Sequence, residues 1–486
     1  MRTRGINIML IVSLIAFLVL WGYIIFLPVV MPSTWDQVDF ALGVTRFDLL
    51  AMQPHFPGYP FFMFAAMVVH YVVKDAEAAL SIWNKLIYLT SLYPLFKLAR
   101  HSLSPRPAFL TALLIHCLPF PLLMMQQPIS EPMALAIFFW FLWSLMRAVE
   151  QGTREAGIWP MVLLAVLLGV RLSYVAVFVA VIVYWIWYWK QTKDGRGIVF
   201  QLFILIAANL AWVSALISNA GSLQTFIKIA LGFTDGHFTE WGGTAIASDA
   251  AVWERMSYLL FHNLLWSGMF VEDLPLAILL GGTFVAAGFM MNKRMGDVIS
   301  LSWLAVFLSY FLWVLFAQNI DKPRHSLPLI SLLPLLLLTK VNWKRWFTAA
   351  VAVTVMTEMM VAIPLVKEQA LDEPAVIQAS NYLEEMKEPF IVYTWEETRV
   401  FEYRQVSFSH KRLFSYDRFL ADVSSQKNRR IYLTDKVVSG FEQQIGHSLQ
   451  EQLTKQAEFT SNHLFDPVYD QVILYEWMPS GGGKNE

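Results

Sequence analysis

The chain has 486 residues, of which 57% are hydrophobic, 15% are aromatic and only 15% are charged, and its mean hydropathy is +0.50. A soluble core cannot bury this much apolar surface, so the composition excludes a soluble protein and indicates a membrane protein. The formal net charge of -1 lacks the basic excess that nucleic-acid binding requires. The single cysteine, Cys117, excludes a disulfide framework and a cysteine-based metal site.

Apolar runs in the first three quarters of the chain predict an all-α polytopic membrane protein with about eleven transmembrane helices. The first run is longer than a signal-peptide core and has no small-x-small cleavage site, so we expect a retained signal anchor. The predicted spans are residues 9–30, 78–98, 107–126, 132–149, 158–172, 174–189, 198–219, 274–291, 298–317, 325–339 and 346–365.

Lysines and arginines collect in alternate loops between these spans. Short cytoplasmic loops are enriched in these residues, so the pattern predicts a cytoplasmic N-terminus and an outer location for the loop after the first span. The clusters are Arg2 and Arg4; Lys97, Arg100 and Arg106; Arg147 and Arg154; Lys190, Lys193 and Arg196; Lys293 and Arg294; and Lys340, Lys344 and Arg345. We expect the protein to be integral to the plasma membrane.

Two further segments are predicted to lie at the outer face without crossing. Residues 56–73 are apolar, but they are short for a span and begin with prolines and aromatics that suit the membrane interface. Residues 220–272 form a second long outer segment that contains Trp241, Trp253 and Trp266. These tryptophans form either an aromatic wall for lipid or sugar or an interfacial anchor, and the sequence leaves both interpretations open.

The composition becomes charged and soluble in character after Pro364. We therefore predict two domains, a transmembrane domain over residues 1–365 and a small extracytoplasmic α/β domain over residues 366–486. In the second domain, the pattern predicts helices at 374–386, 415–426 and 440–457 and strands at 389–395, 429–434 and 471–478. The final residues, SGGGKNE, resemble a flexible tail.

The stretch after the first span is far more polar than its surroundings. Asp36 and Asp39 lie one turn apart if this piece is helical, so both carboxylates can face one cleft. An aspartate can act as the general base that takes the proton of an acceptor hydroxyl. Alternatively, the two acids cap a juxtamembrane helix or solvate the loop.

Basic and histidine side chains in other outer segments suit an anion. Arg324, with Lys322 and His325 beside it in NIDKPRH, can grip two phosphate oxygens at once. Ordinary interfacial snorkelling is the alternative for these residues. His55, held between prolines in QPHFPGYP, either binds phosphate, orients the base or is a structural hydrogen-bonding group. Arg171 lies inside an apolar stretch and is therefore a functional candidate, unless it pairs structurally with an acid such as Glu131.

Metal and cofactor sites are not expected. Asp235, His237 and Glu240 are close in sequence, but their spacing fits no standard metal site. No segment resembles a nucleotide-binding domain, so no nucleotide sugar is expected either.

Three motifs in their order along the chain, WDQVDF, QPHFPGYP and DKPRHSLP, resemble the C-type glycosyltransferase superfamily (GT-C). The resemblance covers residues 9–339 and is closest to the mannosyltransferases and aminoarabinose transferases that use polyprenyl-phosphate sugars. It departs from the family pattern at Gln37, where a second acid is common, and at His325, where a tyrosine is usual. These departures leave open whether Asp36 or Asp39 is the base.

The resemblance implies a GT-C-like fold with juxtamembrane helices and an inverting transfer of a hexose or pentose from a polyprenyl-phosphate-linked donor to an acceptor hydroxyl. Asp36 or Asp39 would be the general base, and His55, Arg171, Lys322, Arg324 and His325 would bind the substrate, with Glu131 at a position where the family often contacts substrate. The partners would be membrane lipid, the lipid-linked donor, and a protein, lipid or wall-polymer acceptor. The alternatives are a transporter or flippase of lipid-linked saccharides and a non-catalytic scaffold whose outer domain binds saccharide.

Overall fold

The computed structural model describes residues 2–291, 296–426 and 428–478. The predicted Lys293 and Arg294 cluster and the SGGGKNE tail lie outside these residues. The chain forms two compact units, the first made of Met1–Val30 and Phe40–Ala370 and the second of Met31–Asp39 and Leu371–Glu486.

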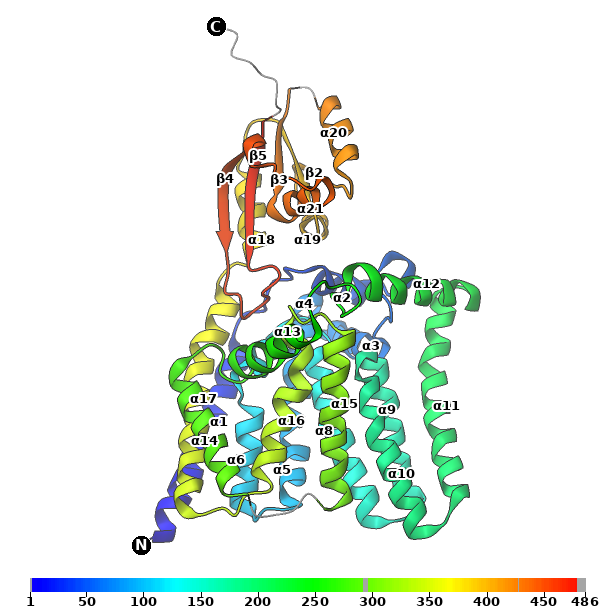
Figure 1. Cartoon of the computed structure of the whole chain (residues 1–486), viewed down its shortest axis with the longest axis vertical. Coiled ribbons are helices and arrows are strands. Elements are labelled where there is room, and N and C mark those ends of the chain that lie inside the picture. The colour runs from blue at the N-terminus through cyan, green and yellow to red at the C-terminus, as the bar shows by residue number, and fades with distance from the viewer. Residues whose placement is uncertain (1, 292–295, 427, 479–486) are drawn as a thin grey trace. The chain divides into compact units, whose positions relative to one another are not determined.

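The first unit consists of helices (Figure 1). They are α1 (Arg2–Phe26), α2 (Trp35–Thr45), which begins in the second unit, α3 (Pro60–Val73), α4 (Ala76–Thr90), α5 (Leu92–Arg100), α6 (Pro105–His116), α7 (Pro119–Gln126), α8 (Glu131–Gln151), α9 (Ile158–Val170), α10 (Val179–Thr192), α11 (Gly195–Asn219), α12 (Leu223–Gly236), α13 (Val252–Ser257), α14 (Leu274–Phe289), α15 (Val298–Ala317), α16 (Leu327–Leu338) and α17 (Arg345–Leu371).

Each predicted span coincides with one of these helices or with two consecutive ones. Within the described residues, six helices are long and apolar enough to cross a membrane, or seven if α6 and α7, which meet at 51°, form one span. Shorter apolar helices include α9, α14 and α16. The chain is thus an integral membrane protein with a mostly helical fold, and the number of eleven crossings stays a prediction.

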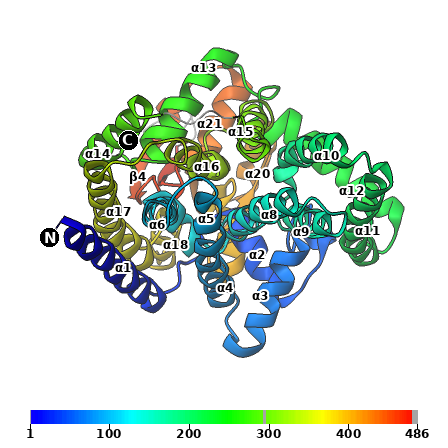
Figure 2. The same ribbon diagram turned by 90° about the horizontal axis from the view of Figure 1, so that it is seen from below.

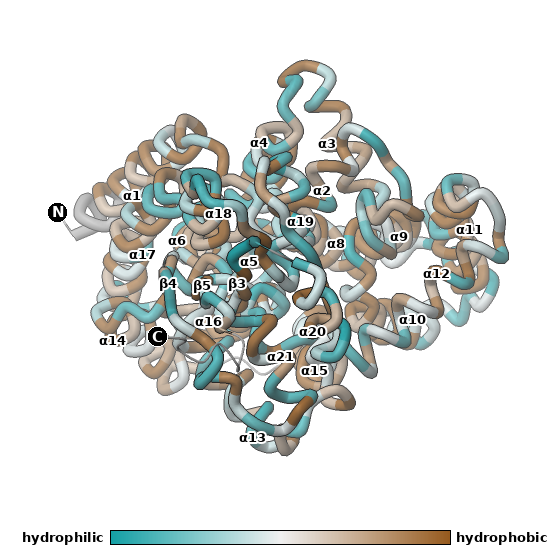
Figure 3. The backbone as a smooth tube through the Cα atoms, turned by 90° about the horizontal axis from the view of Figure 1, so that it is seen from above, coloured by the Kyte–Doolittle hydropathy of each residue, from teal (hydrophilic) through white to brown (hydrophobic). Residues whose placement is uncertain are grey.

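Central and peripheral helices differ in what surrounds them (Figure 2). Helices α5, α6, α8 and α16 lie in the middle of the bundle, and nearly every residue of α8 is buried. Helices α1 and α11 lie at the rim, and most of their apolar side chains are exposed. Figure 3 shows hydrophobic residues along these rim helices. Such exposed apolar surface requires lipid as its solvent.

Aspartates begin several of the spans. The side chains of Asp75, Asp194, Asp273 and Asp297 each accept a hydrogen bond from a backbone N–H in the first turn of α4, α11, α14 and α15, at 2.6 to 2.9 Å. These caps satisfy N–H groups that the helix itself leaves unpaired, which places the span ends at these residues.

The loops that carry the predicted cytoplasmic clusters, between α5 and α6, α8 and α9, α10 and α11, and α16 and α17, lie at the end of the bundle where α1 begins (Figure 1). Helix α3, which has 14 residues, lies at the other end together with α12 and α13. The alternation that the predicted orientation requires is therefore present. Which end faces the cytoplasm stays a prediction.

The second unit contains a five-stranded mixed sheet in the order β2-β1-β3-β5-β4. Strands β2, β1 and β3 are parallel, and β5 is antiparallel to β3 and β4. The strands are β1 (Phe390–Thr394), β2 (Ser409–Arg412), β3 (Arg430–Thr434), β4 (Leu453–Thr460) and β5 (Gln471–Trp477), and the helices are α18 (Ala375–Glu384), α19 (Glu397–Arg404), α20 (Tyr416–Ser425) and α21 (Asp435–Ile445). The predicted small α/β domain is present.

The predicted helix over 440–457 is wrong. Helix α21 ends at Ile445 because Gly446 adopts the left-handed conformation (φ 72°) that stops a helix. The following residues form β4, which pairs with β5. The polar composition of 446–460 hid this edge strand, because its side chains are mostly exposed and carry little hydrophobic alternation. Helix α19 and strand β2 were not predicted either.

The division between the units differs from the predicted domain boundary. The first unit continues through α17 to Ala370, and Met31–Asp39 belongs with the C-terminal residues. A prediction that divides a chain into continuous segments cannot recover such an exchange. Its cause is the set of contacts that Trp35 and Asp39 make with α19 and β2, described below.

Candidate functional site

Three charged side chains from distant parts of the chain meet in the first unit. The Oε1 atom of Glu131 lies 3.1 Å from Nη2 of Arg171 and 3.2 Å from Nε of Arg324. The side chain of Glu131 is 3% exposed, that of Arg324 6% and that of Arg171 13%. Arg171 also donates from Nη1 to Oγ of Ser130 at 3.1 Å. We call Glu131, Arg171 and Arg324 the Glu–Arg cluster.

Each member of the Glu–Arg cluster lies at the end of a helix. Glu131 is the first residue of α8, where the helix dipole favours a negative charge, and Pro132 follows where its missing N–H costs nothing. Arg171 is the residue after α9 and has an extended backbone. Arg324 lies in a short 3-10 turn, Pro323–Ser326, directly before α16. The bundle therefore brings three span ends together at one polar point.

The charges of the cluster do not cancel, because two guanidinium groups face one carboxylate. The second carboxylate oxygen of Glu131, Oε2, is buried and has no hydrogen-bond partner among the described residues. A buried oxygen left in this state is costly, so it is suited to accept a hydrogen bond from a bound molecule. The cluster can hold an anion such as a phosphate beside a hydroxyl or amino group.

Lys322 and His325 flank Arg324 in the chain, and both are half-buried. The Nδ1 atom of His325 lies 3.0 Å from the carbonyl oxygen of Asn319, so this nitrogen carries a proton and donates it to the carbonyl. This bond turns the segment back on itself before α16 begins. The two residues add donors and charge to the segment that carries Arg324.

His55 lies in a loop that is packed rather than free. It is 7% exposed, its Nε2 lies 2.9 Å from the hydroxyl oxygen of Tyr59, and its ring stacks on Phe233. Gly58 has a φ of 84°, and a Cβ atom there would come within 2.9 Å of Leu216 and of Leu49, so only glycine fits this turn.

The His55 loop is connected to the Glu–Arg cluster through a tyrosine. Tyr59 bonds to His55 and is also close enough to Arg171 to interact with it electrostatically. His55 therefore has a structural hydrogen bond, as one of the predicted alternatives requires, and this bond leads toward the cluster.

Sequence reasoning missed the residues that hold the Arg324 segment. Arg255 in α13 is 2% exposed and donates to the backbone carbonyls of Leu315, Gly243 and Gln318 at 3.1 to 3.2 Å. Asn263 donates to the carbonyl of Ile320 at 2.6 Å. These bonds satisfy carbonyls at the end of α15, which no helical partner reaches. The only sequence signal was a charged residue in an otherwise amphipathic stretch.

The predicted acids lie in the first turns of α2, within the second unit. Asp36 is half-buried, whereas Asp39 is 0% exposed and bonded to Arg399. Asp48, a third acid in the same stretch, caps a 3-10 turn and pairs with Arg46 at 2.6 Å. The three acids thus have three different surroundings.

Asp235, His237 and Glu240 do not form a metal site in the structure. The Nε2 of His237 lies 3.0 Å from the carbonyl oxygen of Ala317, and Asp235 and Glu240 are exposed. In the part of the chain that the structure describes, no three His, Cys, Asp or Glu side chains are grouped to hold a metal ion.

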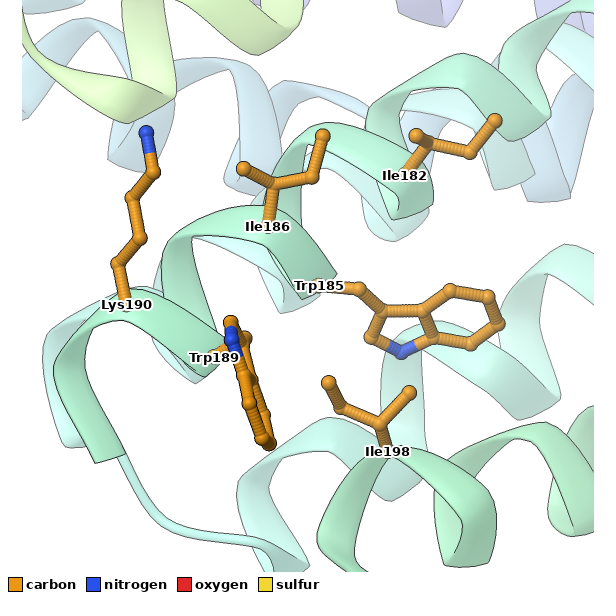
Figure 4. Close-up of a pocket in the computed structure, with 6 residues that line it drawn as sticks. All are labelled: Ile182, Trp185, Ile186, Trp189, Lys190 and Ile198. Atoms are coloured by element: carbon orange, nitrogen blue, oxygen red, sulfur yellow. The ribbon is translucent and has the colours of Figure 1, made fainter. Parts of the chain in front are cut away.

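A separate hollow of about 340 Å³ lies between α10 and α11 (Figure 4). It is apolar except for one lysine, and none of the predicted site residues lines it. Its walls are Ile182, Trp185, Ile186, Trp189, Lys190 and Ile198. It is a feature of two rim helices rather than part of the Glu–Arg cluster.

Comparisons with known proteins support the resemblance that the motifs carry. Residues 54–213 match the sequence pattern of the dolichyl-phosphate-mannose-protein mannosyltransferase family. No curated protein sequence matches the chain.

Solved structures with the same fold are membrane glycosyltransferases by their titles. The crystal structure of ArnT from Cupriavidus metallidurans bound to undecaprenyl phosphate has a TM-score of 0.56 at 11% identity, with 99% of each chain covered. Its apo state has a TM-score of 0.57 at 12% identity, covering 96% of this chain and 97% of that chain. The arabinofuranosyltransferase AftD from Mycobacteria has a TM-score of 0.50 at 15% identity, covering 98% of this chain and 40% of that chain.

At these identities the structural likeness shows the fold. The family match over residues 54–213 and the shared membrane fold together confirm the resemblance of this chain to the C-type glycosyltransferases.

Proposed function

We propose that the protein transfers a sugar from a polyprenyl-phosphate-linked donor to an acceptor hydroxyl at the outer face of the membrane, with inversion at the anomeric carbon. The observation that carries this proposal is the Glu–Arg cluster, in which two buried guanidinium groups share one carboxylate oxygen. The fold shared with ArnT, which binds undecaprenyl phosphate, supports a lipid-linked donor.

In this reaction the Glu–Arg cluster binds the lipid phosphate, which is the leaving group. Negative charge grows on the phosphate as the bond to the sugar breaks, and fixed guanidinium groups in a dry site stabilise that charge. Glu131 holds Arg171 and Arg324 in place before the substrate arrives. Its free oxygen, Oε2, accepts a hydrogen bond from the donor sugar.

The general base is Asp36. It takes the proton from the acceptor hydroxyl while the oxygen attacks the anomeric carbon on the face opposite the phosphate, which inverts the configuration. Asp39 is the weaker candidate because it is fully buried and bound to Arg399. The acceptor is a protein, a lipid or a wall polymer, and no metal takes part in the proposed step.

The test is transfer of labelled sugar from polyprenyl-phosphate donors to candidate acceptors by the purified full chain. Asp36→Asn should lower the turnover by about 10²- to 10⁴-fold, the usual contribution of a general base. Arg147→Gln, at an exposed ion pair on α8, is the matched control and should transfer normally. Normal transfer by Asp36→Asn would contradict the assignment. Movement of the intact lipid-linked sugar across proteoliposome membranes without transfer would favour a flippase instead.

A further inference from the structure

The second unit holds the first turn of α2 through a buried ion pair. Nε of Arg399 donates to Oδ1 of Asp39 at 2.9 Å, and Nη2 lies 2.8 Å from the same oxygen. Asp39 is 0% exposed, and the Arg399 side chain is 14% exposed. A charge pair this far from water is held rigidly, because loss of either partner leaves an uncompensated buried charge.

A second contact fixes the same turn. The Trp35 ring lies 5.4 Å from the guanidinium carbon of Arg399 and 4.7 Å from that of Arg412 on β2. Arg412 also lies over Trp395 and Phe414, each at 4.6 Å. These distances are typical of cation–π interactions.

The two contacts act on one face of the helix. Trp35 and Asp39 are four residues apart and therefore lie one above the other on α2. Two attachment points on one face fix both the rotation and the height of the first turn. Asp36, which lies between them in sequence, belongs to this turn and is not one of the attachment points.

We propose that Arg399 is a positioning residue that orients the helical turn carrying Asp36, so that the C-terminal domain controls the reactivity of the base. This inference rests on the proposed function of Asp36. It gives the C-terminal domain a role within the reaction rather than only in recognition of an acceptor. A helix attached at Asp39 presents the Asp36 carboxylate in one direction, whereas a released turn samples several.

The test combines hydrogen exchange with kinetics on the full chain in nanodiscs. In Arg399→Gln, amides of 35–45 should exchange at least about tenfold faster than in wild type, while strand amides of β1, β3 and β5 keep their protection. Turnover should fall by about tenfold or more with the KM for the donor unchanged, because binding at the Glu–Arg cluster is untouched. Arg399→Lys should recover part of both effects, and Arg418→Gln, an exposed arginine of α20, is the control.

If Arg399→Gln also exposes the strands, Arg399→Lys replaces it as the deciding variant, with faster exchange confined to α2. Wild-type exchange across 35–45 in the deciding variant overturns the positioning role. Failure of wild-type protein to transfer sugar would sink the proposed function, and the exchange result would still decide whether Arg399 holds α2.

Discussion

Arg324 Nε lies 3.2 Å from Oε1 of Glu131, so a residue in the turn before α16 is bonded to the first residue of α8. Both side chains are buried, and Glu131 accepts Arg171 at the same oxygen. An acid that serves two arginines leaves a positive surplus, which is what a phosphate group requires. The same arrangement makes the free protein depend on Glu131 for its stability.

Glu131→Gln should destabilise the protein strongly. The amide keeps the shape of the side chain but leaves two guanidinium groups facing each other without a countercharge, at a cost of about 3–5 kcal/mol. Thermal unfolding in detergent should therefore show a clearly lower midpoint. Glu150→Gln, at an exposed ion pair near the end of the same helix, is the control, and an equal midpoint for both variants would contradict the cluster's structural role.

Arg255→Met should weaken the segment that carries Arg324. The change removes three hydrogen bonds from a charged donor to buried carbonyls, each worth about 1.5–3 kcal/mol. We expect a lower unfolding midpoint together with a raised KM for the donor. The control is Arg46→Gln, because the Arg46 side chain is 72% exposed. Unchanged stability and unchanged KM in Arg255→Met would show that the segment is held by other contacts.

Much of the fold could be predicted because its cause is local. Apolar runs of span length determine the membrane helices, and aspartates mark several of their starts. The candidate residues at helix ends, Glu131, Arg171 and Arg324, stood out because charges beside apolar runs are expensive unless they are used. Arg171 and Glu131 were even considered as a pair.

What could not be predicted depends on contacts between distant segments. Nothing in the sequence near Asp39 indicates Arg399, and nothing near Arg255 indicates the carbonyls at the end of α15. The edge strand β4 was mistaken for helix because its partner β5 follows it in the chain and its exposed side chains carry no apolar stripe. Tertiary pairing decided these elements.

Tyr59→Phe tests whether the link from His55 to the cluster matters. The change removes only the hydroxyl that lies 2.9 Å from His55 Nε2, a bond worth about 1 kcal/mol. We expect the kcat/KM for transfer to fall by about fivefold, the rate equivalent of that energy. Tyr71→Phe, whose ring is 79% exposed on α3, should transfer normally. If Tyr59→Phe transfers as fast as this control, the hydroxyl is not part of the site.

Glu397 makes the stability of the second unit depend on pH. Burial, with a smaller contribution from Asp435, raises the pKa of Glu397 to about 6. The folded state then holds the proton more tightly than the unfolded state, so the stabilising contribution is complete below the ordinary pKa and is lost as the pH rises through 6. The loss is about 2 kcal/mol.

Glu397→Gln cannot ionise and should escape this loss. The stability of Glu397→Gln relative to wild type should increase between pH 5 and pH 8 by about 2 kcal/mol, measured by calorimetric unfolding of the full chain. Glu451→Gln, at an exposed position, should show the same pH dependence as wild type. A Glu397→Gln difference that stays constant with pH would contradict the assignment.

The central claim, that the Glu–Arg cluster binds the lipid phosphate, is tested most directly by the affinity for undecaprenyl phosphate itself. Arg324→Gln removes a buried charged donor and should weaken binding by at least about 30-fold, whereas Arg147→Gln should bind as wild type does. Equal affinity of wild type, Arg324→Gln and Arg147→Gln would contradict the claim.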